Sequence, residues 1–362
     1  MIRKTLLSLA LPLVAACGGG DAAVRLGMAG PFTEGFGRAN QLGAELAVEQ
    51  INAAGGIDGR MLALVLRDDA GDGARAAAIA EEFVADASIA AVVGHVTSGA
   101  MMAAAGIYDG EMVALATTAS SAAITGISPW VFRVISSDSA NGADLARFAE
   151  RLGRRRVAIL YENDAYGRGL AAAFRGNFGG EVLTMDPIDA DASDSTIYAD
   201  WLAARAPDLV FVAGTERSGL ALLAAARRAG VRADFLGGDG WTGVTVDTAL
   251  AEGALVGAPF TAEDTREAAQ AFVRAFREKH GYDPDGNAAL AYDAVQVLAT
   301  AIRAVGSERG RIRDWLASRS TETAIPGVTG AIAFQASGDP IGKSFTMTRV
   351  RGGALVPVEG NR

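Results

Sequence analysis

The sequence predicts an α/β protein built from two doubly wound parallel sheets, each in a lobe of its own. Short apolar runs alternate with longer stretches of helical periodicity along most of the 362 residues. Short apolar strands that are each followed by a helix are typical of parallel sheets covered on both faces. The length exceeds what one hydrophobic core usually organises, and the alternation starts again after Val131 to Val134. Both observations indicate two lobes with a cleft between them.

The N-terminus has the pattern of an export signal that ends at a lipid attachment site. Met1 to Lys4 is positively charged, and Leu6 to Val14 is apolar but too short to span a bilayer. The small residues that precede Cys17 resemble a bacterial lipobox, which implies that Cys17 is the first mature residue and carries the lipid. We therefore expect a lipoprotein signal peptide at residues 1–17 and a flexible tether at residues 18–23.

The rest of the sequence predicts neither a disulfide bond nor a transmembrane helix. Cys17 is the only cysteine, so we expect no internal disulfide. No later apolar stretch has the length of a transmembrane helix by inspection of the sequence. A lipid anchor is therefore the only expected contact with the membrane.

The first half of the chain is predicted to form five strands and their connecting helices. The strands are Val24 to Met28, Met61 to Arg67, Ala90 to Val93, Met112 to Leu115 and Val131 to Val134. A helix is expected from Gly37 to Ala53, because Gly55 and Gly56 follow it and glycine commonly ends helices. A second helix is expected from Ala74 to Ala87, because its apolar residues share one face.

The second half repeats the same alternation. The expected strands are Val157 to Tyr161, Val182 to Met185, Leu209 to Ala213 and Phe235 to Gly238. Helices are expected after the first strand as far as Phe178, around Ile197 to Arg205, and from Ser218 to Ala229. Thr265 to Ser318 has mainly helical periodicity, and Ala331 to Phe334 and Ser344 to Val350 have the pattern of late strands.

Two neighbouring loops of the first half are rich in hydroxyl groups. Gly94 to Gly99 and Ala116 to Ser121 each follow a short apolar strand and precede a stretch of helical pattern. In a parallel sheet such loops meet at the carboxyl edge, where hydroxyls and helix N–H groups can bind an anion. The alternative interpretation is that Ser98 and Ser120 only cap the helices that follow them.

Composition and motifs argue against nucleic-acid binding and catalysis. The net charge of −9 opposes binding to phosphate backbones. A glycine pattern at Gly167 to Ala172 has the spacing of a dinucleotide fingerprint, but Glu162 and Asp164 precede it and would repel a pyrophosphate. The two histidines, His95 and His280, are isolated, and no nucleophile elbow or metal-ligand spacing is found. We therefore expect no enzyme activity, no cofactor and no metal.

Several short motifs resemble one known family over nearly the whole mature chain, from Val24 to about Asp339. They are Gly27 to Pro31, Ile51 to Gly59, Asp68 to Ala70, Gly94-His95, Ala116 to Thr125, Phe132-Arg133 and Asp164 to Gly167. In these segments the chain resembles the branched-chain amino-acid binding proteins of bacterial ABC importers, which have the type I periplasmic binding protein fold. The resemblance implies two lobes joined by three crossovers. Lobe 1 would hold residues 24–137 and 260–338, and lobe 2 residues 138–259 and 339–362.

The resemblance also implies a set of residues that bind an amino-acid zwitterion. Ser98 and Ser120 would hold the α-carboxylate, and the backbone carbonyl of Thr118 would accept from the α-ammonium. Asp239 would supply the negative partner from the second lobe, where many relatives use glutamate. Tyr166 and Phe36 would form apolar walls, and Thr215 stands where many relatives carry an aromatic residue, which leaves the side-chain specificity open.

Each of these residues also has a simpler interpretation. Asp239 lies between glycines and is a common turn former, whereas Phe36 and Tyr166 have the character of packing residues. Their joint fit to one pocket favours the binding role.

The expected function is an extracytoplasmic, lipid-anchored receptor that binds an amino acid and delivers it to ABC permease subunits. We expect it to act as a monomer on the periplasmic or cell-surface face of the membrane. Two alternatives stay open at this point. One is a regulatory or sensory lipoprotein of the same fold that acts through protein contacts. The other is a receptor for a different small carboxylate or amide.

Overall fold

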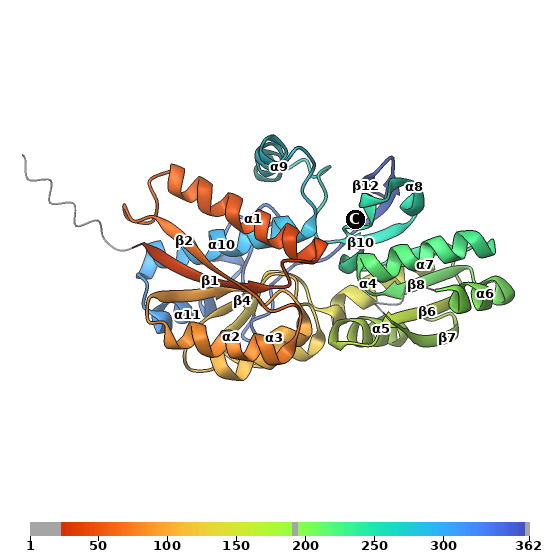
Figure 1. Ribbon diagram of the computed structural model, residues 1–362, viewed down its shortest axis with the longest axis horizontal. Coiled ribbons are helices and arrows are strands. Elements are labelled where there is room, and N and C mark those ends of the chain that lie inside the picture. The colour runs from red at the N-terminus through yellow and green to blue at the C-terminus, as the bar shows by residue number, and fades with distance from the viewer. Residues whose placement is uncertain (1–22, 190–194, 359–362) are drawn as a thin grey trace, which may run out of the picture.

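The computed structural model describes residues 23–189 and 195–358, and these form two α/β lobes that lie side by side (Figure 1). Cys17 and the predicted signal peptide fall outside these residues. The first lobe contains a five-stranded parallel sheet in the order β2-β1-β3-β4-β5. Its strands are β1 Val24–Gly30, β2 Leu62–Asp68, β3 Ile89–Val93, β4 Ala114–Ala116 and β5 Val131–Arg133.

Helices cover both faces of this sheet. They are α1 Gly35–Ala53, α2 Gly73–Ala85, α3 Ser98–Tyr108, η1 Ala122–Ile124, α9 Glu267–His280, α10 Gly286–Val305 and α11 Arg309–Ala317. Adjacent residues of β1 point to opposite faces, as a pleated strand requires. Met28 packs in a cluster with α1 and α10, whereas Ala29 packs with α2 and α3. The first lobe is therefore doubly wound, as predicted.

The pairing of α1 with α10 depends on a close helix approach. A Cβ on Gly43 of α1 would overlap the carbonyl oxygen of Ala288 in α10. Glycine at this position lets the two backbones touch, although α10 follows α1 by more than 200 residues. The late helical segment thus completes the first lobe.

The second lobe contains a seven-stranded sheet in the order β12-β11-β10-β9-β8-β6-β7. Its strands are β6 Arg156–Glu162, β7 Glu181–Ile188, β8 Leu209–Ala213, β9 Asp234–Gly237, β10 Leu255–Ala258, β11 Thr346–Arg351 and β12 Ala354–Pro357. Strands β6 to β10 are parallel, but β11 pairs antiparallel with β10, and β12 pairs antiparallel with β11. The expected parallel sheet thus carries two antiparallel strands at this edge.

The helices of the second lobe also cover both faces of its sheet. They are α4 Asp138–Arg151, α5 Ala165–Asn177, α6 Thr196–Arg205, η2 Asp239–Trp241, η3 Val244–Val246, α7 Glu216–Ala229 and α8 Thr248–Ala251. Ile159 of β6 packs with α4 and α5, whereas Leu160 packs with α6 and α7. The alternation of inward directions along one strand again produces two covered faces.

The chain passes between the two lobes three times. The connections lie between β5 and α4, between β10 and α9, and between α11 and β11. Each lobe is thus made of segments that are far apart in the sequence (Figure 1). The exact lobe boundaries stay a prediction.

Two local expectations need correction. Ala331 to Phe334 forms no strand and makes only isolated bridges, Ile325 with Ile332 and Phe334 with Pro340. These partners lie within eight residues in the sequence, so the segment folds back on itself instead of joining a sheet. Strands β10 and β12 were not expected, because both are four-residue segments with little periodicity to mark them.

Helix α10 also corrects the expectation that no later segment is long and apolar enough for a membrane span. By length and composition alone, Gly286–Val305 passes that test among the described residues. Most of the helix is buried inside the protein, however, where its apolar residues pack against α1 and the first sheet. A core helix of this kind has the same composition as a membrane helix because both are surrounded by apolar groups.

Candidate ligand-binding site

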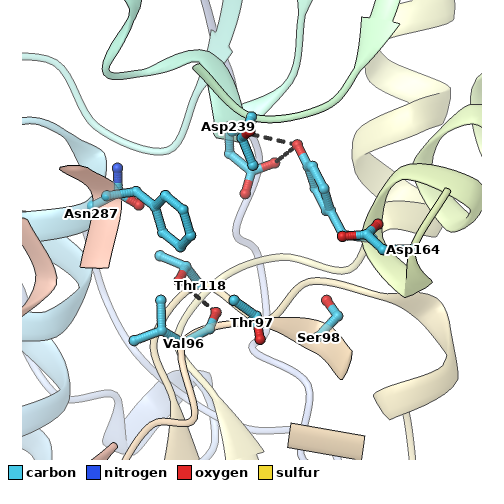
Figure 2. Close-up of a pocket in the computed structure, with 11 residues that line it drawn as sticks. Val96, Thr97, Ser98, Thr118, Asp164, Asp239 and Asn287 are labelled. Carbon is cyan, nitrogen blue, oxygen red and sulfur yellow. Dashed lines mark hydrogen bonds between the residues drawn. The ribbon is translucent and has the colours of Figure 1, made fainter. Parts of the chain in front are cut away.

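A cavity lies between the lobes at the carboxyl edges of both sheets (Figure 2). The loops that follow β3, β4, β6, β8 and β9 all contribute to it, together with the first turns of α1 and α10. Its lining residues are Phe36, Val96, Thr97, Ser98, Thr118, Asp164, Tyr166, Thr215, Asp239, Gly240 and Asn287. The space between the lining atoms measures about 460 Å³, including the part that is open to solvent. Ligands bind at this edge in open α/β sheets generally.

The structure brings together six of the seven residues expected at the ligand. The side chains in the cavity wall are those of Phe36, Ser98, Thr118, Tyr166, Thr215 and Asp239. The exception is Ser120, which is fully buried and does not line the cavity. Its hydroxyl has no hydrogen-bond partner among the residues that the structure describes. The roles of all seven residues toward a ligand stay predictions.

The hydroxyl loops of the first lobe are not simple caps at the two serines. Thr97, not Ser98, is the N-cap of α3, and its hydroxyl accepts from the N–H of Ala100 at 3.4 Å. Ser98 Oγ instead accepts from the N–H of Ser121 at 3.1 Å, which joins the two loops. Ser121, not Ser120, is the N-cap of η1. The interpretation of Ser98 and Ser120 as helix caps is therefore wrong.

The buried guanidinium of Arg133 holds the second hydroxyl loop, Ala116 to Ser121, through its backbone carbonyls. Arg133 Nη1 donates to the carbonyl oxygens of Ser120 and Ser121, each at 2.9 Å. Its Nε donates to Asp339 Oδ1 at 2.7 Å, and its Nη2 donates to Thr125 Oγ1 at 2.7 Å. Arg133 thus ties β5, this loop and the third connection between the lobes into one polar cluster.

A second buried cluster supports the first hydroxyl loop. His95 Nδ1 lies 2.7 Å from Asp69 Oδ2, and its Nε2 lies 3.1 Å from the hydroxyl of Tyr108. All three side chains are buried, and burial together with the charge of Asp69 raises the pKa of Tyr108. The expectation that His95 is isolated is therefore wrong. It joins β2, β3 and α3 immediately before the lining residues Val96 to Ser98.

The wall from the second lobe is built around Asp239. The Tyr166 hydroxyl donates to Asp239 Oδ1 at 3.0 Å and accepts from the N–H of Gly240 at 3.1 Å (Figure 2). A side chain on Gly240 would crowd both Tyr166 and the carbonyl of Gly214, so glycine is needed for this approach. Burial raises the pKa of Asp239 to about 6, although the hydrogen bond from Tyr166 acts in the opposite direction.

A buried glutamate fixes the position of Thr215. Glu162 Oε1 accepts from the Thr215 N–H at 2.8 Å and from its hydroxyl at 2.7 Å. Glu162 ends β6 and Thr215 follows β8, so this contact holds together two loops at the carboxyl edge. The Thr215 hydroxyl is therefore occupied as a donor by the protein itself.

Polar contacts cross between the lobes beside the cavity. Asn287 Nδ2 donates to Thr242 Oγ1 at 3.0 Å, and this links the start of α10 to the end of η2. Arg217 and Glu34 form an ion pair at 2.9 Å across the opening, where both side chains are largely exposed. Such exposed pairs contribute about 0–1 kcal/mol each. Such an ion pair therefore stabilises the contact between the two lobes only weakly.

Sequence reasoning missed several residues of the cavity wall. The missed residues are Val96, Thr97, Asp164, Gly240 and Asn287. Asp164 was seen only as part of a motif, and it caps α5 by accepting from the Gly167 N–H at 2.7 Å. Asn287 stands far along the chain in a helical stretch, and no local signal marks it. Most of the others lie within two residues of a predicted site, so the strand-end rule could have included them.

The family model described as periplasmic binding protein matches residues 23–354 of this chain. This chain belongs to the periplasmic binding protein family. Members of this family are substrate-binding receptors. The fold prediction and the resemblance to the branched-chain amino-acid binding proteins are confirmed.

Relatives of this periplasmic binding protein carry names that specify their ligands. It is 32% identical over 339 residues to a leucine-, isoleucine-, valine-, threonine- and alanine-binding protein of Pseudomonas aeruginosa, covering 90% of this chain and 89% of the relative. The branched-chain amino acid transporter substrate binding protein LivJ from Streptococcus pneumoniae, solved in complex with isoleucine, superimposes with a TM-score of 0.86. That pair is 28% identical and covers 93% of this chain and 99% of the other.

A solved structure with lower sequence identity shows likeness in fold alone. A solute binding protein of an ABC transporter from R. palustris, solved in complex with benzoate, has a TM-score of 0.85 at 22% identity. It covers 93% of this chain and 95% of its own. The same fold thus occurs in proteins solved with different ligands, isoleucine and benzoate.

Proposed function

We propose that this protein is the extracytoplasmic receptor of an ABC importer and binds an amino acid in the cleft between its lobes. The observation that carries the proposal is the pairing of opposite chemistries across one cavity. Hydroxyl groups and the N-terminus of α3 lie on one wall, and the buried carboxylate of Asp239 lies on the other. An amino-acid zwitterion has one group for each wall. The named ligands of the P. aeruginosa and S. pneumoniae relatives support this choice.

The α-carboxylate would bind at the first wall. Ser98 is the first residue of α3, so its N–H and that of Gly99 point out of the helix without helical partners, whereas the Ala100 N–H is held by the Thr97 hydroxyl. The helix dipole adds a partial positive charge at the same place. A carboxylate there would accept hydrogen bonds from these N–H groups and from the Ser98 hydroxyl, with no basic side chain required.

The α-ammonium would bind at the second wall and the adjacent loop. An ammonium has three donors and no acceptor, so it needs oxygen atoms around it. Asp239 supplies a carboxylate whose Oδ1 is already held by Tyr166, and the loop that carries Thr118 supplies backbone carbonyls. The ring of Phe36 would cover the side chain of the ligand.

Binding would close the lobes and present a single form to the permease. The ligand contacts both lobes, so it stabilises the closed arrangement relative to the open one by its differential affinity. The three connections allow the lobes to rotate as units, which is the usual hinge closure of such receptors. We propose that the monomer in its closed form is the species the permease subunits recognise.

A thermal-shift screen tests the proposed function. The twenty amino acids and their analogues without the amine are added one at a time to the purified protein. At least one amino acid is expected to raise the melting temperature, because a ligand that binds only the folded state stabilises it. Titration calorimetry then measures its affinity. A screen in which only acids without an amine raise the melting temperature would reject the amino-acid assignment.

The variant that carries both Ser98→Ala and Ser120→Ala is expected to bind the amino acid more weakly. Each lost hydrogen bond to the buried carboxylate costs about 1.5–3 kcal/mol, or about tenfold to a hundredfold in affinity. Calorimetry measures the change, with Ser318→Ala at the exposed end of α11 as the control. Unchanged affinity in the double variant would show that neither hydroxyl binds the ligand.

The lipid anchor is proposed from the sequence, since Cys17 lies outside the described residues. Cys17→Ser is expected to release the protein from the membrane fraction or to leave the precursor unprocessed, because the thiol is the attachment atom. Fractionation and mass spectrometry of the mature N-terminus measure both outcomes. Wild-type protein in the soluble fraction, with a mature N-terminus at another residue, would contradict the anchor.

A further inference from the structure

Three buried side-chain oxygens around the start of α4 have no hydrogen-bond partner within the described parts of the chain. They are Ser120 Oγ and both carboxylate oxygens of Asp138. Asp138 is the first residue of α4, and its N–H donates to the Ser120 carbonyl at 2.8 Å. Unpaired buried oxygens are costly, so a group that satisfies them is expected to enter during function.

Asp138 shares its surroundings with the Asp239 carboxylate of the proposed ligand site. The charge of Asp239 raises the pKa of Asp138. The charges of both carboxylates also affect the pKa of Tyr166, which is a residue of α5. Burial, and then the charges of Asp239 and Asp138, raise the pKa of Tyr166, so that hydroxyl stays protonated. The cluster therefore holds two buried carboxylates and a neutral tyrosine hydroxyl.

Arg133, whose charge acts on Asp138, is already committed to other groups. Arg133 of β5 donates to Asp339, to Thr125 and to two backbone carbonyls. Asn141, one turn along α4, is held by Ser136 through both ends of its amide. Two carboxylates that share a buried site without a cation of their own cannot both ionise cheaply.

We propose that Asp138 and Asp239 hold one proton between them in the empty cleft and release it to solvent when the ammonium of the ligand binds. The O–H bond of the shared proton breaks, and a buffer base takes the proton. The ammonium then replaces that proton as the positive partner of the pair. Asp239 is the member of the pair that lies in the cavity wall, so it is the carboxylate that the ammonium contacts. This inference rests on the proposed amino-acid function.

The electrostatics of the two groups agree with this exchange. Burial, and then the charge of Asp239, raise the pKa of Asp138 well above its ordinary value, while Ser120, Arg133 and Asn141 act in the opposite direction. Burial raises the pKa of Asp239 to about 6. A bound ammonium favours the charged form of both carboxylates, so it lowers the pKa values of the pair. Between the free and the bound values, binding releases a proton.

The sign of the pH effect follows directly. Affinity is complete above the pKa of the free pair and falls as the pH drops through it. One released proton per ligand corresponds to about tenfold weaker binding per pH unit below that value, by proton linkage. A ligand without an amine would show the opposite sign, because its uptake favours the protonated pair.

Titration calorimetry in buffers of different ionisation enthalpy tests the proposal. The wild-type protein is titrated near pH 6 with the amino acid found by thermal shift. The expected result is a binding enthalpy that changes linearly with the buffer enthalpy, with a slope that approaches one released proton. Asp138→Asn removes one titrating carboxylate with little change of shape, so the slope is expected to fall by more than half. Asp144→Asn, on the same helix at the surface, is the matched control with an unchanged slope.

The outcomes separate this inference from the proposed function. Amino-acid binding with the same enthalpy in every buffer would overturn the proton exchange and leave the receptor function intact. The same slope in Asp138→Asn as in wild type would remove Asp138 from the exchange. If Asp138→Asn does not fold, the wild-type slope from pH 5 to pH 8 decides alone, since it must vanish well above the pKa of the free pair. Failure of every amino acid to bind would instead reject the proposed function.

Discussion

Asp239→Ala is expected to abolish amino-acid binding at ordinary concentrations. The substitution would leave the ligand ammonium without its carboxylate in a closed, water-poor cleft, and such losses typically cost about 2–5 kcal/mol. That range corresponds to about 30-fold to several thousandfold in affinity. The same variant is expected to bind the matching acid without its amine as well as, or better than, the wild type does. The repulsion between Asp239 and an uncharged or anionic group would be gone.

Calorimetry with both ligands measures this change of preference. Asp239→Asn serves as a matched variant, because its amide oxygen can still accept from the Tyr166 hydroxyl while the charge is lost. Weak binding in both variants would show that charge, not shape, holds the ammonium. If wild type binds both ligands equally and Asp239→Ala changes neither affinity, Asp239 is only a turn residue and the ligand is not an amino acid.

Arg133→Ala is expected to lower the free energy of unfolding by a large fraction of its total. Removing one partner of a buried ion pair typically costs about 3–5 kcal/mol, because the other charge is left buried without compensation. The Arg133 side chain is buried against Asp339. The carbonyls of Ser120 and Ser121 would lose their donor at the same time. The substitution is therefore expected to lower the free energy of unfolding and to change the conformation of the second hydroxyl loop.

Urea denaturation followed by circular dichroism measures the effect on the free energy of unfolding. Arg154→Ala is the matched control, since its pair with Asp234 is partly exposed. That control is expected to lose only about 0–1 kcal/mol. Equal losses in the two variants would show that the Arg133 cluster adds nothing beyond a surface ion pair.

The order of strands and helices was predictable because each element is buried on a regular face. The apolar strands β1, β3, β6 and β8 and the amphipathic helices between them repeat in the sequence with clear periods. The antiparallel strands β11 and β12 were not distinguishable as such, because strand direction depends on which edge is free when the chain returns. Ala331 to Phe334 has a strand-like composition, yet only nearby partners reach it.

The site residues that could be predicted are those that lie directly after a predicted strand or that match the family resemblance. Ser98, Thr118 and Asp239 lie in the loops after strands that the pattern identified, so the fold brought them together. The burial of Ser120 was not predictable, because its partners come from later elements: Arg133 of β5 and the N–H of Asp138 in α4 both donate to its carbonyl. Asp138 follows Val131 to Val134 with the same strand, polar loop and helix order as the two hydroxyl loops. A third use of that rule would have found it.

The three passages of the chain between the lobes affect how the protein can be made. The apolar side of α1 and one face of the first sheet stay uncovered until α10 is synthesised, more than 230 residues later. The second sheet gains its last two strands only at residues 346–357. The second lobe begins before the first is complete, and the first is completed by α10 before the second receives β11 and β12. An N-terminal fragment that stops before α10 therefore contains no complete core. Shortening the C-terminus would remove a sheet edge from a lobe that begins about 200 residues earlier, at α4. Both cores can therefore close only when the chain from β1 to β12 is present.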